Sequence, residues 1–124
     1  MTGMDAQGGW TLNDHLASSA TLDQLKSGKW EYVILQEQSE IPAIDQSRIT
    51  SMYPAIRQFA SKIDGLGATP MLFMTWAHLA GLPANGLPDY QSMQFEIDRG
   101  YLDIAHKLHV AVAPVGYAWL IALG

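Results

Sequence analysis

Cysteine is absent from the 124 residues, and charged residues are scarce at 15% of the chain. The lack of cysteine excludes a disulfide framework and a thiolate zinc site. Lysine and arginine form no cluster and the formal net charge is −5, so nucleic acid is not an expected partner. No apolar run approaches the roughly 18 residues that span a bilayer, so we expect no membrane partner either.

Targeting and metal-binding signals are also missing. The first ten residues hold no basic region followed by an apolar one, unlike a signal peptide, and we expect a cytoplasmic location. No His, Asp or Glu spacing is typical of a metal site, and we expect neither a metal nor a cofactor. Hydrophobic residues, in contrast, make up 48% of the chain. This composition excludes disorder and predicts one packed domain over residues 1–124.

Three short apolar runs have the length of β-strands, namely Trp30–Leu35, Met71–Trp76 and Val110–Val115. Each is apolar on both faces, which is typical of parallel strands covered by helices. Between them, apolar residues recur at helical spacing from Ile49 to Ile63 and from Tyr90 to Leu108. The order strand–helix–strand–helix–strand predicts right-handed crossovers and an α/β fold. The expected architecture is a three-layer α/β/α sandwich with a short parallel sheet.

Local signals predict where other helices begin and end. Either Thr11 or Asn13 caps a short first helix, and Thr21 caps a second one that Gly28 ends. Pro54 lies inside the first long helical pattern. It predicts either a kink or the first turn of a helix that follows a separate turn.

Polar residues and tryptophans follow the predicted strands, where ligands bind in open α/β sheets. After the first strand, Gln36 offers a side-chain amide that can stabilise an oxyanion. Glu37 is a candidate base, and Ser39 is a candidate nucleophile if a base lies within reach. The alternative is a polar loop that caps the next helix. No glycine elbow surrounds Ser39, which favours that alternative for the serine.

The ends of the other two strands add a histidine and two aromatic residues. His78 follows the second strand and is a candidate partner of Ser39 across adjacent strand ends. The alternative is a solvated loop histidine. Trp76 and Trp119 lie near the same ends, where they are candidate stacking platforms for a ligand.

Four motifs together resemble the central part of the SGNH (GDSL-like) hydrolases: GGWTLNDHL, WEYVILQEQSEIP, TPMLFMTWAH and VAPVGYAW. The resemblance implies a flavodoxin-like parallel sheet and hydrolysis of esters, often of acyl groups on carbohydrates or lipids. It implies that Gly9, or Gly8 in a shifted register, turns its backbone N–H toward an oxyanion. It also implies that Gln36 is the amide of the oxyanion hole, with Gln38 as the second choice.

Two blocks of that family have no counterpart in the sequence. The family's nucleophile is a serine in a Gly-Asp-Ser or Gly-Asn-Ser turn, and Met1–Gln7 contain no serine. The family's Asp-x-x-His lies well beyond the Pro-Val-Gly-x-Ala-Trp segment, and Gly124 follows Trp119 by five residues. We therefore expect a truncated SGNH-like domain that recognises a small acyl or carbohydrate ligand and is catalytically incomplete alone. The alternatives are a binding module and a self-associating protein without catalysis.

The same resemblance predicts an assembly. In the family, the first strand lies beside the strand that corresponds to Trp30–Leu35. Without it, Tyr32 and Ile34 would lie on an exposed edge, and exposed edges pair with other chains. We expect a homodimer or a larger homo-oligomer.

Overall fold

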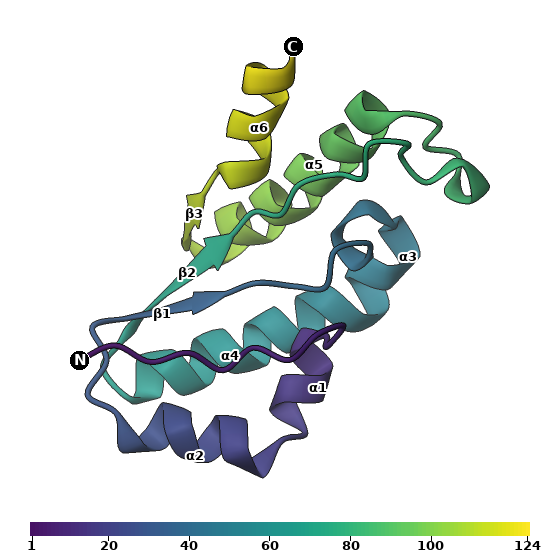
Figure 1. The fold of residues 1–124 in the computed structure, drawn as a ribbon. Helices are drawn as coiled ribbons and strands as arrows, with labels where there is room; N and C mark the ends of the chain where they lie inside the picture. The colour runs from purple at the N-terminus through teal and green to yellow at the C-terminus, as the bar shows by residue number, and fades with distance from the viewer.

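All three predicted strands lie side by side and run in the same direction in the computed structural model, which describes residues 1–124 (Figure 1). The strands are β1 (Tyr32–Leu35), β2 (Thr69–Phe73) and β3 (Ala111–Ala113), in that order across the sheet. Both pairings are parallel. The predicted α/β class with a short parallel sheet is therefore confirmed.

The strands are shorter than the apolar runs that predict them. β2 begins at Thr69, which pairs with Tyr32, and it ends at Phe73, which pairs with Ala113. Residues up to Trp76 were expected in this strand, yet beyond Phe73 only one ladder bond continues, from Met74 N to Ala113 O at 3.1 Å. Apolar composition marks burial, whereas a strand also needs a neighbour to pair with.

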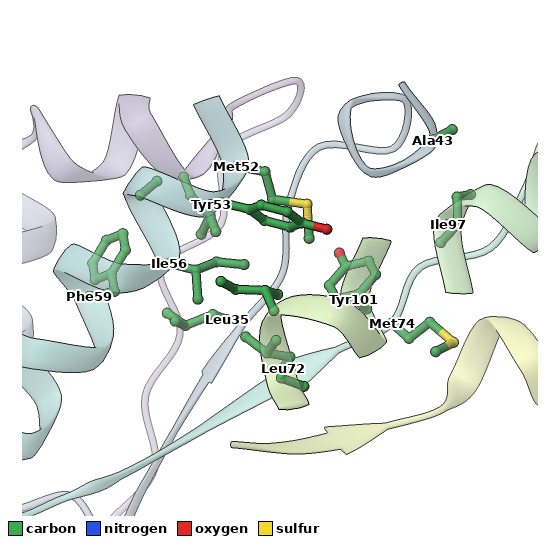
Figure 2. Close-up of a cluster of buried hydrophobic side chains, with 14 of the residues drawn as sticks. Leu35, Ala43, Met52, Tyr53, Ile56, Phe59, Leu72, Met74, Ile97 and Tyr101 are labelled. Carbon is green, nitrogen blue, oxygen red and sulfur yellow. The ribbon is translucent and has the colours of Figure 1, made fainter. Parts of the chain in front are cut away.

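The two long connections, α4 (Tyr53–Gly65) and α5 (Tyr90–Leu108), pack together on one face of the sheet. The Tyr53 hydroxyl donates a hydrogen bond to the Gly100 carbonyl oxygen of α5 at 2.8 Å. Crossovers of the same hand that advance in one direction place their helices on the same face. Both helices therefore share one hydrophobic core with the strands (Figure 2). Its most deeply buried side chains include Ile56, Ile63, Leu72, Ile97, Tyr101 and Ile104.

The second long helix has both of its predicted ends. Asp89 caps α5 by accepting a hydrogen bond from Ser92 N at 2.8 Å, and the Ser92 hydroxyl accepts one from Asp89 N. His109 follows the helix in a left-handed conformation with φ of 54°. Gly100 lies in the middle because a Cβ there would come within 2.6 Å of both Arg48 Cδ and Pro42 O.

Pro54 lies in the first turn of α4, after a separate turn, as one of the two alternatives predicted. The helix α3 (Asp45–Ser47) and the π-helical turn η2 (Arg48–Met52) lead directly into α4. In this wider turn, Tyr53 N donates to Arg48 O, five residues earlier. Proline has no N–H, and its ring clashes with the carbonyl four residues before it, so a widened turn accommodates it.

Two short helices precede the sheet, α1 (Leu12–Leu16) and α2 (Ser19–Ser27). Thr11 rather than Asn13 caps α1, as one of the two alternatives predicted. The predicted cap of α2 is wrong, because Ser18 rather than Thr21 occupies that position and accepts from Thr21 N. Ser18 has the same capping chemistry and adds one turn to the helix. The Thr21 hydroxyl instead donates to Asp5.

The opposite face of the sheet is open at β1. Side chains alternate along a strand, so Tyr32 and Ile34 lie opposite Leu35, and each is 59% exposed. The helix α6 (Val115–Leu123) continues from the end of β3 and projects away from the sheet (Figure 1). Its exposed apolar residues are Tyr117, Trp119, Ile121 and Leu123.

The remaining elements are the short turns η1 (Ile41–Ala43) and η3 (Pro83–Asn85). None of the helices combines the length and apolarity that crossing a bilayer requires.

Candidate functional site

The segments that follow the three strands meet at one end of the sheet. The loops after β1 and β2 approach each other where His78 Nδ1 lies 3.9 Å from Glu40 Oε1. The loop after β2 meets the start of α6 where Gly116 N donates to Met74 O at 3.2 Å. The start of α1 joins them through Glu37. We call this end the rim, made of residues 8–12, 36–40, 74–78 and 114–119.

Glu37 connects two segments of the rim to each other and to the helix beneath them. Its Oε1 atom accepts hydrogen bonds from Leu12 N at 3.0 Å and from Gln38 N at 2.8 Å. The Leu12 N–H belongs to the first turn of α1, where backbone donors have no helical partner. Glu37 N donates to the Tyr101 hydroxyl oxygen of α5 at 3.2 Å. One residue thus ties α1, the loop after β1 and α5 together.

The Glu37 side chain is buried, with 2% of the residue exposed. Burial raises the pKa of its carboxyl, and the N–H groups of Gln38 and Leu12 oppose that shift. A folded-state pKa above the unfolded value means that this group's contribution to stability is complete at low pH. That contribution is lost as the pH rises through the raised value. Glu37 was predicted as a base and a substrate contact, but its carboxyl lies beneath the rim and serves backbone N–H groups instead.

The two glutamines of the loop after β1 differ in surroundings. Gln36 is exposed on the surface of the rim. Gln38 is half-buried, and its Oε1 accepts from Glu40 N at 2.8 Å and from Ile41 N at 3.2 Å. Gln38 therefore caps the turn η1, which is the role that the polar-loop alternative predicts.

The predicted pairing of Ser39 with His78 is not formed. No hydrogen bond joins the two side chains, and the His78 ring faces Glu40. His78 N donates to the sulfur of Met93 at 3.2 Å, which fixes the backbone of this histidine against α5. Ser39 is half-buried and has no base within hydrogen-bonding distance.

The glycine turn before α1 lies beside the loop after β1. Gly9 adopts a left-handed conformation with φ of 77°, which only glycine adopts readily. Trp10 N donates to Gln7 O at 3.1 Å and closes this turn. Both Gly8 and Gly9 are exposed. Gly9 precedes Leu12 by three residues, and Leu12 is the residue that Glu37 ties to the loop that carries Gln36.

A buried glutamine that the sequence analysis missed fixes the loop after β2. Gln94 of α5 is fully buried, and its Oε1 accepts from Ala77 N at 2.8 Å. Its Nε2 donates to Thr75 O at 3.3 Å and to Asp98 Oδ1 at 2.8 Å. Gln94 lies four residues after Tyr90 on the buried stripe of α5, and a polar residue at such a position was the available signal.

The start of α6 packs against this same junction. A Cβ at position 116 would overlap the Thr75 carbonyl oxygen and the Gln94 amide nitrogen, so only glycine fits. The two predicted stacking residues lie close to this junction in the sequence, since Trp76 follows Thr75 and Trp119 lies three residues after Gly116. They are 46% and 50% exposed. Their indole surfaces are therefore available to a ligand.

A buried arginine, also missed, holds the turn that follows the rim loop. Arg48 is 2% exposed and donates to Pro42 O at 2.9 Å, to Asp45 Oδ1 at 2.9 Å and to Glu96 Oε2 at 3.1 Å. These bonds connect η1 to α5. The charge is compensated by two carboxylates, as a buried ion requires.

Features at other places in the fold do not add to the rim. A cleft at the opposite pole, where β2 and β3 begin, is lined by residues that include Arg57, Asp64, Thr69 and His109. No group of three or more His, Cys, Asp or Glu residues is arranged to hold a metal ion.

No protein-family model matches the sequence, and no curated protein matches it either. Among solved structures, the fold matches a protein described as a putative SGNH hydrolase from Slackia heliotrinireducens, with a TM-score of 0.77 and 23% sequence identity. The match covers 92% of this chain and 64% of that chain. The chain therefore has the fold of that protein and spans less than two thirds of its length. At this identity the similarity shows the fold alone.

Proposed function

We propose that the chain is an SGNH-hydrolase-like domain whose rim binds the acyl group of a small ester, with acylated carbohydrates as the substrate class. The observation that carries the proposal is the bridge made by Glu37 between Leu12 N and Gln38 N. This bridge brings the glycine turn and the loop after β1, the two segments with candidate oxyanion donors, to one part of the rim. The shared fold with an SGNH-type protein supports the same interpretation.

The donors suit the charge that develops when an ester is attacked. The Gly9 N–H and the exposed Gln36 amide are neutral donors on two adjoining segments. In acyl transfer, one such preorganised donor lowers the barrier by about 3 kcal/mol. Gln38 is the second choice for the side-chain donor, because its oxygen is occupied by two backbone N–H groups and only its NH2 end is left to donate.

Catalysis by the isolated chain is not part of the proposal. A serine is a weak nucleophile without a general base to accept its proton, and Ser39 has no hydrogen bond to His78. Catalytic groups of this type act as a unit, so the loss of one removes most of the rate. We therefore infer that the rim recognises an acyl group without efficient turnover.

The test combines a rate with a binding measurement. We expect the purified chain to hydrolyse p-nitrophenyl acetate and butyrate at the rate of buffer alone. Turnover that disappears in Ser39→Ala would contradict the inferred lack of catalysis. We expect a monoacetylated pentose to change tryptophan fluorescence with saturation, and the unacetylated sugar to have a much smaller effect. Trp76→Phe should reduce this signal, and the absence of saturable binding would contradict the proposed ligand.

A self-associating protein without a ligand is the second candidate. The exposure of Tyr32 and Ile34 on the open face favours it. Fluorescence that does not respond to the acetylated sugar, together with a stable assembly in solution, would support this candidate over the first.

A further inference from the structure

We propose that Glu37 is a positioning residue whose buried carboxyl sets the spacing between the glycine turn at Gly8–Gly9 and the loop after β1. This spacing decides whether the N–H of Gly9 and the amide of Gln36 can reach the same oxygen atom. The role in ligand binding rests on the proposed function, whereas the role in holding the two segments can be tested without a ligand.

A single oxygen atom joins the two segments. Glu37 Oε1 accepts from both Leu12 N and Gln38 N, although Leu12 is 25 positions away in the sequence. The capping bonds between Thr11 and Asp14 are local. Leu12 packs in the core and Asn13 Nδ2 donates to Ser51 Oγ at 3.0 Å, which places α1 against α4 and η2. The bond to Glu37 is the hydrogen bond that ties the start of α1 to the loop after β1.

The Glu37 carboxyl has no cationic partner. The charged group acting on its carboxyl is the Asp14 carboxylate, which has the same sign, and the neighbouring Tyr101 hydroxyl is neutral. Its partners are therefore backbone N–H groups, so the function of the carboxyl is to hold backbone.

One oxygen of the Glu37 carboxyl has no partner. Glu37 Oε2 is buried and makes no hydrogen bond. An unsatisfied buried polar atom costs about 1–3 kcal/mol, and an apolar side chain would avoid that cost. The presence of a carboxyl at position 37 despite this penalty fits a requirement for its other oxygen.

Amide hydrogen exchange tests the holding role directly. In Glu37→Ala, we expect the Leu12 and Gln38 amides to exchange about tenfold faster, since each loses its acceptor. The Ala77 amide, which Gln94 holds, serves as the internal reference and should not change. Glu37→Gln keeps the accepting oxygen and should retain protection. Unchanged protection of Leu12 in Glu37→Ala would overturn the inference. If that variant fails to fold, Glu37→Asp, which withdraws the oxygen by one methylene, is measured with the same criteria.

Binding of the monoacetylated pentose tests the consequence for the rim. We expect Glu37→Ala to weaken binding about tenfold, equivalent to about 1.4 kcal/mol, and Glu37→Gln to stay within about twofold of the wild type. Tyr53→Phe is the matched control, because it removes a buried hydrogen bond between α4 and α5 that involves no rim residue. It should leave binding unchanged.

The two measurements separate the inference from the proposed function. A wild-type chain that does not bind the sugar would contradict the proposed function, and amide exchange alone would then decide the role of Glu37. A wild-type chain that binds, with Glu37→Ala binding equally well, would overturn the inference and leave the proposed function intact.

Discussion

The two faces of the sheet have similar sequences but different surroundings. Leu72 of β2 is 1% exposed beneath α4 and α5, whereas Ile34 of β1, on the opposite face, is 59% exposed. Both faces consist of side chains that suit a protein interior. The difference shows that the apolar character of a strand predicts burial on both sides only where the chain supplies helices for both sides.

The loops of the rim also differ in what holds them in place. Polar side chains that bond to backbone fix the loops after β1 and β2, through Glu37, Arg48 and Gln94. After β3, the apolar helix α6 is buried only at Gly116. Directional hydrogen bonds therefore order the loops of the candidate site, while apolar side chains without cover leave α6 on the surface.

The largest effect on stability is expected from a comparison of two truncated isoleucines, one in the core and one on the open face. Ile63 of α4 is fully buried, so Ile63→Ala should lower the free energy of unfolding by about 4 kcal/mol through lost burial and a cavity. Ile34→Ala removes the same atoms from an exposed position and should cost less than about 1 kcal/mol. Urea unfolding of both variants measures the difference. Equal losses would show that the open face is buried in solution.

A smaller effect is expected at the junction of α6 with the loop after β2. Gly116→Ala places a methyl group against Thr75 O and the Gln94 amide and should cost about 3 kcal/mol through overpacking. Gly65→Ala, at the end of α4, meets no neighbouring atom and should raise stability by up to about 1 kcal/mol. Thermal unfolding compares the two. A Gly116→Ala chain as stable as the wild type would mean that α6 does not pack at this junction.

The parts of the fold that the sequence predicts correctly are those set by local signals and periodicity. Asp89 and Ser92 form a capping pair three residues apart, and the start of α5 follows from it. The error at the cap of α2 also has a local cause, because Ser18 and Thr21 are both residues that cap helices well. The end of the sheet that carries the candidate site was predictable because the carboxyl ends of parallel strands lie together.

The arrangement of the site was only partly predictable. Glu37 continues the alternation of Val33 and Leu35, so its inward direction was available from the strand pattern. The contacts of Gly116 with Thr75 and of Arg48 with Glu96 join segments about 40 or more positions apart. No local pattern encodes such pairs, because they depend on how the helices dock. Whether the rim residues bind a ligand stays a prediction.

The smallest effect on folding is expected from a charge on the open face, where it tests association instead. We propose that two copies of the chain cover each other's open face at β1, because its free edge and its exposed Tyr32 and Ile34 can bond and pack together. Light scattering should give twice the 13.6 kDa of one chain for the wild type. Ile34→Lys should change stability little and give the single-chain mass, whereas Leu66→Lys, on an exposed residue after α4, should not alter the mass. A wild-type mass of one chain would contradict the dimer. A lysine at position 34 would be desolvated without a partner if the open face were the interface. A doubled mass in both variants would therefore place the interface elsewhere.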